Sequence, residues 1–163
     1  MDTAELIRDL GLLPHPEGGH FRETYRSTQR VQHPANENSV RSAGTSILYL
    51  LCRGQISRLH RLTSDELWHF HLGGPLGVVQ IAPSGELSEQ LLGPDLGCGH
   101  CLQVVVPAGS WFGARLHGSA PFALVGCTVA PGFEFEDLEL GQRKRLLERF
   151  PQHCQVVLEL TSA

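Results

Sequence analysis

The stretch GQISRLHRLTSDELWHFHLG, residues Gly54–Gly73, predicts two short strands that carry ionisable side chains. The runs Ser57–Leu62 and Glu66–His71 are rich in apolar and aromatic residues and are bounded by turn residues, which is typical of strands. Successive side chains of a strand point to opposite faces, so each run has one inward-facing set. His60 and Glu66 are the ionisable residues that we expect on those inner faces.

The alternation of side chains assigns neighbours to each of these two residues. Arg58 shares the face of His60, while Trp68 and Phe70 share the face of Glu66. Three ionisable groups beside two aromatic rings form a mostly apolar pocket with a few placed polar groups, as small-molecule sites do. The alternative is that His60 and Glu66 satisfy each other's hydrogen bonds in a filled barrel.

Further short apolar runs follow and precede this stretch, and turn residues separate them. Many short strands at this spacing indicate a sandwich or closed barrel rather than alternating strands and helices. These expected strands are His20–Arg26, Thr45–Cys52, Leu76–Ile81, Leu87–Leu92, Cys101–Val106, Trp111–Leu116 and Phe122–Val129.

The helical signals lie near the two ends of the chain. Thr3–Leu12 predicts a short helix that Gly11 helps to end, and Leu140–Phe150 predicts a helix stopped by Pro151. Gln29–Gly44 is polar and is expected to be a long loop. A chain of 163 residues is long enough for one full core, so we expect a single domain over 1–163.

Charge and composition narrow the partners and the compartment. The net charge is −4, with dispersed basic residues, which argues against binding to nucleic acid or to an anionic membrane. The N-terminus has the acidic residues that a signal peptide lacks, and the five cysteines fit reduced thiols. These features predict a cytoplasmic protein.

Five blocks of sequence resemble the DUF985, or cupin-5, family of the RmlC-like cupins. They are HPEGGHFRETYRS (15–27), TSILYLL (45–51), SRLHRLTSDELWHFHLG (57–73), VVVPAGSWFGARL (104–116) and VGCTVAPGFEFEDLELG (125–141). The resemblance implies an all-β, cupin-type jelly-roll barrel, usually a homodimer, with no settled activity. It also implies a structural kinship with dTDP-sugar 3,5-epimerases, metal-free cupins that use a histidine base.

The same resemblance places hydrocarbon at two positions where cupins usually carry metal ligands. Leu62 and Phe112 stand where the two cupin motifs normally have histidine. Neither side chain offers a donor atom to a transition metal. We therefore expect no resident metal or other cofactor, although His60 and Glu66 alone could hold a metal weakly.

The block around Gly18–Gly19 holds a second group of polar residues. Arg22 shares one strand face with Thr24 and Arg26, and Glu23 shares the other with Phe21 and Tyr25, so one set alone can look inward. A solvated strand is the alternative. His15 and Glu17 precede this strand.

Three other motifs favour structure over chemistry. His69 and His71 fall on the outward face, unless a bulge near Asp65 reverses the alternation. Cys98 and Cys101 resemble a redox pair but lie in a turn with no helix pattern after it. The segment Pro131–Asp137 alternates aromatic and acidic residues and is expected to pack on the barrel or at a dimer contact.

These observations lead to three hypotheses of function. The first is a site for a nucleotide, sugar or nucleotide-sugar, with epimerase- or isomerase-like acid–base chemistry. In it His60 acts as base, Glu66 as partner or second acid and Tyr25 as a candidate acid, while Arg22 and Arg58 clamp anions and Trp68, Phe70 and Phe112 contribute aromatic walls. The second is a non-catalytic ligand-binding or dimeric scaffold. The third, a metal-dependent enzyme, is disfavoured by Leu62 and Phe112.

Overall fold

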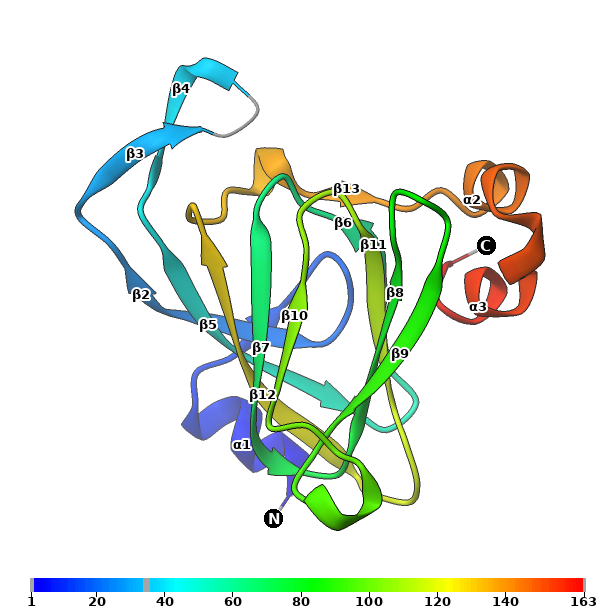
Figure 1. The fold of residues 1–163 in the computed structure, drawn as a ribbon. Helices are drawn as coiled ribbons and strands as arrows, with labels where there is room; N and C mark the ends of the chain where they lie inside the picture. The colour runs from blue at the N-terminus through cyan, green and yellow to red at the C-terminus, as the bar shows by residue number, and fades with distance from the viewer. Residues whose placement is uncertain (1, 34–35, 163) are drawn as a thin grey trace.

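Two antiparallel sheets face each other in a jelly-roll sandwich, and a third sheet of two strands lies outside it (Figure 1). The computed structural model describes residues 2–33 and 36–162. The first sheet has the order β1 (Leu13–Pro14), β2 (His20–Arg26), β5 (Thr45–Cys52), β12 (Phe122–Ala130), β7 (Asp65–Gly73) and β10 (Gln103–Val106). The second has the order β13 (Glu139–Leu140), β6 (Ile56–Arg61), β11 (Trp111–Leu116), β8 (Leu76–Ile81) and β9 (Leu87–Leu92). This architecture confirms the expected all-β jelly roll. In the described residues, hydrogen bonds do not join the two sheets into a closed barrel.

The main core lies between the sheets and is built from their inward-facing residues. Trp68, Tyr49 and Phe112 are its largest members, each about 1% exposed, and the rings of Trp68 and Phe112 meet edge to face with centroids 6.4 Å apart. Leu76 and Val125 fill the space around them. Burying each such side chain contributes roughly 1.5–3 kcal/mol to the stability of the fold. This core fixes the spacing between the two sheets, and the polar site lies beside it.

Helices cover the outer faces of both sheets. They are α1 (Thr3–Asp9), α2 (Arg143–Arg149) and α3 (Cys154–Glu159), with 3₁₀ turns η1 (Leu96–Cys98), η2 (Phe135–Asp137) and η3 (Pro151–His153). Leu146 of α2 and Val157 of α3 pack on the second sheet, while the apolar side of α1 packs on the first. The two predicted terminal helices are present, and α3 is an addition that Pro151 does not prevent. No helix in the described residues is long and apolar enough to cross a bilayer.

The expectation of a long loop over Gln29–Gly44 is wrong outside residues 34–35, which lie beyond the described part. Strands β3 (Arg30–His33) and β4 (Asn36–Ser42) pair as a hairpin that extends away from the sandwich (Figure 1). The polar composition of residues 29–44 did not predict this hairpin, because the hairpin has no face in the main core. Arg41, near the base of the hairpin, and His33, at the end of β3, both bind Asp137, with an Arg41 Nε–Oδ2 distance of 2.7 Å and a His33 Nε2–Oδ1 distance of 3.1 Å.

Candidate functional site

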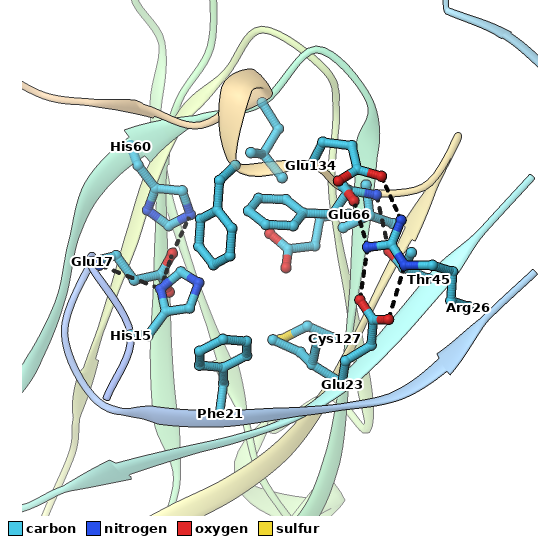
Figure 2. Close-up of a pocket in the computed structure, with 15 residues that line it drawn as sticks. His15, Glu17, Phe21, Glu23, Arg26, Thr45, His60, Glu66, Cys127 and Glu134 are labelled. Atoms are coloured by element: carbon cyan, nitrogen blue, oxygen red, sulfur yellow. Dashed lines mark hydrogen bonds and ion pairs between the residues drawn. The ribbon is translucent and has the colours of Figure 1, made fainter. Parts of the chain in front are cut away.

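A small cavity opens between the two sheets beside the main core (Figure 2). Its volume is about 70 Å³. It is bounded by β2, β5, β6, β7 and β12, by the turn before β2 and by the segment after β12. The lining residues are His15, Glu17, Phe21, Glu23, Arg26, Thr45, Ile47, His60, Leu62, Glu66, Cys127, Val129, Phe133, Glu134 and Phe135.

A tight turn at Gly18 and Gly19 brings Glu17 to the cavity. Gly18 has φ +115°, and a Cβ there would lie 2.2 Å from the carbonyl oxygen of Ile56, so this backbone can approach β6 only as glycine. The Arg58 N–H donates to the Glu17 carbonyl at 2.8 Å, and the Tyr49 hydroxyl donates to the Gly18 carbonyl at 2.8 Å. The turn is therefore fixed to both sheets.

The Glu17 carboxyl group is the centre of a buried polar network. Its Oε2 lies 3.0 Å from His60 Nε2 and 3.5 Å from His15 Nδ1, and Ser57 Oγ donates to its Oε1 at 2.9 Å. Glu17 is 6% exposed and His60 is 2% exposed. Buried polar groups must find partners, and this network supplies them for Glu17.

The partners of each ring place the protons of the two histidines. His60 Nδ1 lies 2.7 Å from the Arg58 carbonyl oxygen, which can only accept, so Nδ1 carries a hydrogen. Nε2 then shares one proton with Glu17. His15 Nδ1 accepts from the Glu17 N–H at 3.3 Å, which leaves the hydrogen of the neutral ring on Nε2. Burial lowers the pKa of His15 and outweighs the opposing charge of Glu17.

A β-bulge in β6 determines which of its side chains enter the cavity. Phe112 pairs with His60 but Ala114 pairs with Ser57, so β6 carries one extra residue in between. Ser57 and His60 consequently both face inward. Gly113 accommodates the bulge, because a Cβ there would lie 2.6 Å from the Ser57 carbonyl oxygen.

Because of this bulge, the Arg58 side chain lies outside the cavity. Its guanidinium bonds outside the cavity to Ser162 Oγ, at 2.9 Å, and to the Pro16 carbonyl oxygen. The prediction that it shares the face of His60 assumed unbroken alternation and is wrong.

A second bulge in β2 mixes the two predicted faces of that strand. Glu23 pairs with Ile47 and Tyr25 with the adjacent Ser46, so the extra residue is Thr24, whose hydroxyl donates to the Ser46 carbonyl at 3.1 Å. Phe21, Glu23 and Arg26 therefore all line the cavity. The expectation that one face alone looks inward is wrong.

The same bulge leaves Arg22 and Tyr25 outside the cavity. Both are exposed, Tyr25 to 58%. Neither can have the anion-clamping or acidic role that the sequence suggested. Tyr49, the other tyrosine, is buried and its hydroxyl is bonded to Gly18.

Glu66 of β7 lines the cavity together with the Cys127 thiol of β12. Burial, and then the charge of Glu17, raises the pKa of Glu66 to about 8. Its Oε2 is buried and has no hydrogen-bond partner in the described residues. Burial also raises the pKa of Cys127 well above its usual range, so this thiol stays protonated.

Aromatic and charged groups surround the opening of the cavity. His15, Phe21, Phe133 and Phe135 form a cluster of rings, with a His15–Phe21 centroid distance of 4.7 Å, and Phe135 is 53% exposed. In the view of Figure 2, the group of His15, Glu17 and His60 lies on one side, and Arg26 with Glu23 and Glu134 lies on the other.

Three aromatic residues predicted as ligand walls belong to the core and do not line the cavity. Trp68 and Phe112 are buried between the sheets, and Phe70 packs against the same cluster. Phe112 supports the site from below, because its ring packs on His60 with a centroid distance of 4.0 Å. Leu62 lines the cavity. Of the two hydrocarbon residues at the usual cupin ligand positions, Leu62 therefore forms part of the wall and Phe112 lies beneath it.

The remaining candidate motifs lie away from the cavity. His69 Nδ1 lies 2.8 Å from Gln103 Nε2, and His71 is exposed. Cys98 is exposed in η1, where a hydrogen bond to Asp95 raises its pKa, the opposite of what a reactive thiol needs. Within the described ranges, no group of three or more His, Cys, Asp or Glu is arranged to hold a metal ion.

Several lining residues were not chosen from the sequence as site residues, namely His15, Glu17, Glu23, Arg26, Cys127, Phe133, Glu134 and Phe135. The signal for the first four was the density of polar residues around Gly18–Gly19. The segment Pro131–Asp137 gave no sequence signal of a site, because its alternation of acidic and aromatic residues is equally typical of a solvent-exposed surface.

The two facing sheets, with a cavity between them, form the fold of the cupin class. Residues 4–141 match the Cupin superfamily (DUF985), and the chain belongs to this family. It is 34% identical over 145 residues to the uncharacterized protein YML079W of Saccharomyces cerevisiae, covering 82% of this chain and 72% of that one.

Solved structures agree with this assignment. Protein SO0799 of Shewanella oneidensis is 41% identical, with a TM-score of 0.90 over 99% of this chain and 98% of that one. A hypothetical protein from Leishmania major is 36% identical, with a TM-score of 0.92 over 99% and 100% of the two chains. Oxalate decarboxylase of Bacillus subtilis, at 15% identity and a TM-score of 0.55 over 91% of this chain and 37% of that one, shares the fold alone.

Proposed function

We propose that the cavity binds a sugar-like ring and exchanges protons with it, in metal-independent chemistry of the epimerase or isomerase type. The observation that carries the proposal is the buried Glu17–His60 pair, 3.0 Å between Oε2 and Nε2, in the same cavity as a Glu66 carboxyl whose pKa is about 8. Two titratable groups with different proton affinities at one site are the usual arrangement for acid–base catalysis.

The two groups can exchange opposite roles. A carboxyl group with a pKa near 8 is present in both forms close to neutral pH, so ionised Glu66 accepts a proton from a ligand carbon. His60 holds the proton shared with Glu17 and delivers it to the other end of the reacting group. The reverse reaction moves both protons back, and the contact with Glu17 holds the His60 ring in place in each direction.

Sugars are favoured over nucleotides as ligands of this cavity. The rings of Phe21 and Phe135 offer flat apolar surfaces beside hydroxyl-binding groups, which suits a sugar. A cavity of about 70 Å³ is small, so part of such a ring would rest against Phe135 at the opening. Of the three ligand classes, namely nucleotides, sugars and nucleotide-sugars, only the sugars remain supported. Arg22 and Arg58 lie outside the cavity and cannot bind the phosphate of the other two classes.

The second candidate is a non-catalytic cupin that binds a ligand or serves as a dimeric scaffold. One observation favours it: neither tyrosine reaches the cavity, so the tyrosine acid of the sugar epimerases has no counterpart here. Glu66 then has to supply the second acid–base group, and a site in which it does not do so is a binding site only.

Thermal unfolding with a panel of neutral monosaccharides, sugar phosphates, nucleotides and nucleotide-sugars tests the binding. A ligand that binds only the native state at a hundredfold excess over its Kd adds about 2.7 kcal/mol, which is a visible shift in melting temperature. We expect sugars to raise the melting temperature of wild type and of the exposed control Arg22→Ala, and to lose the effect in His60→Gln and Glu66→Gln. A panel without effect on wild type would refute the proposed ligand class.

A further inference from the structure

The guanidinium of Arg26 is nearly saturated by its neighbours at the opening of the cavity. Its Nε and Nη2 donate to the two carboxylate oxygens of Glu23 at 2.9 and 2.8 Å. Nη1 donates to Glu134 Oε1 at 2.5 Å, and Nη2 also reaches the Phe133 carbonyl oxygen at 3.1 Å. A guanidinium has five N–H donors, so these four bonds leave one for a ligand.

The positive charge of the Arg26 guanidinium is also compensated by its neighbours. Two carboxylates face one guanidinium, and the hydrogen bonds that Arg26 donates to Glu23 are the largest cause of its raised pKa. Among the lining residues that the structure describes, Arg26 is the one arginine or lysine, whereas Glu17, Glu23, Glu66 and Glu134 are all acidic. With His15 neutral and one proton shared by Glu17 and His60, the cavity has no uncompensated positive charge.

We propose that Glu23 and Glu134 act as specificity determinants: by holding Arg26 between them, they make the cavity accept an uncharged ligand and reject phosphorylated or carboxylated ones. This inference rests on the proposed function for the identity of the ligand as a sugar-like ring. It narrows that class to free, uncharged sugars, whose hydroxyl groups need donors and acceptors rather than a fixed positive charge.

Physical chemistry makes the exclusion of anions strong at this site. An anion that approached Arg26 would come within a few ångströms of two carboxylates, whose combined negative charge exceeds the positive charge of the one guanidinium. It would also lose its own hydration. An uncharged ring meets neither penalty.

The unsatisfied atoms of the cavity suit such a ring. Glu66 Oε2 is buried without a partner, and neutral His15 presents an Nε2 hydrogen, so a hydroxyl group could serve both. Figure 2 shows His15 and Glu66 bordering the same space. Phe21 and Phe135 provide the apolar contact.

The test uses inorganic phosphate as the probe, with binding followed by isothermal titration calorimetry, a readout that does not depend on Arg26 being present. In wild type we expect no saturable response to phosphate. The Glu23→Gln/Glu134→Gln variant frees the guanidinium charge and should bind phosphate at least about tenfold more tightly. Adding Arg26→Gln to that variant should abolish the gain, which separates binding at this site from binding elsewhere on the surface.

Two results would overturn the inference. One is saturable binding of phosphate by wild type that Arg26→Gln removes, since Arg26 would then be an anion anchor. The other is a folded double variant that gains no phosphate affinity. If the double variant does not fold, Glu134→Gln alone should show a smaller gain. A failure of the proposed function is distinguishable, because it would appear as no response to any neutral sugar while these phosphate results remain.

Discussion

Glu17 Oε2 lies 3.0 Å from His60 Nε2, and this contact joins the turn before β2 to the centre of the second sheet. The two side chains are buried, so the loss of either would leave the other without this partner. The contact therefore has two consequences: it ties a loop to the sandwich, and it holds a proton at the wall of the cavity. Both can be measured.

Replacing Glu17 by glutamine should destabilise the protein by about 1 kcal/mol, because hydrogen bonds to a charged group contribute about 1.5–3 kcal/mol and neutral ones about 0.5–1.5 kcal/mol. The amide keeps the size of the side chain and can donate to His60 Nε2 and accept from Ser57 Oγ, but both hydrogen bonds then lack a charged partner. Urea unfolding measures the change. Glu5→Gln in exposed α1 is the matched control and should change stability by less than about 0.5 kcal/mol. Equal effects of the two substitutions would contradict the role given to Glu17.

Glu66 should make the stability of the protein fall as pH rises. Its pKa is raised from an ordinary 4.5 to about 8 in the folded protein, so between these values the folded state keeps a proton that the unfolded chain releases. Rising pH then favours unfolding, by up to about 1.4 kcal/mol per pH unit. Below pH 4.5 both states are protonated, and above about 8 both are ionised, so the effect is confined to that window.

The Glu66→Gln variant isolates this dependence. Relative to wild type, the variant should become progressively more stable from about pH 5 to about pH 8 and then stay level. Unfolding curves at a series of pH values provide the comparison. A difference between the two proteins that does not depend on pH would show that Glu66 is ionised throughout. In Glu17→Gln the pKa of Glu66 should fall, because the charge of Glu17 is one of its causes.

We expect the protein to be a homodimer. Strand β10 is an edge of the first sheet, and Leu102 and Val105 are each 52% exposed there. An apolar edge strand is prone to pair with another chain, and a second copy is the partner that the family resemblance suggests. Light scattering should report a dimer at micromolar concentration, and Val105→Lys should weaken it. A monomeric wild type would contradict the expectation.

The alternation of residues was enough to predict the sandwich but not which side chains line the cavity. The predicted strands from Thr45 to Val129 correspond closely to β5–β12, because their apolar faces meet in one core. Bulges in β2 and β6 then shift the alternation by one residue and send Arg58 and Tyr25 out of the site. Gly113, inside the expected strand that pairs with β6, was a sequence signal of the bulge in β6.

Long-range contacts account for the rest of the difference. Glu17 reaches His60 because a glycine turn crosses the open end of the sandwich, and no periodic pattern encodes such a crossing. Arg26 meets Glu134 across the opening for the same reason. Residues of this kind are identifiable in the sequence only as a local excess of polar groups, which is equally typical of a solvated strand.

The most direct test of the account is whether a neutral sugar exchanges carbon-bound hydrogen with solvent in the cavity. Monosaccharides that raise the melting temperature would be incubated with the protein in D₂O and analysed by NMR and mass spectrometry. We expect deuterium at a single carbon, with the rate reduced at least about a hundredfold, the usual share of a general acid or base, in both His60→Gln and Glu66→Gln but unchanged in Arg22→Ala. Binding without deuterium incorporation, or incorporation that survives both substitutions, would contradict acid–base chemistry at this site and leave a binding protein.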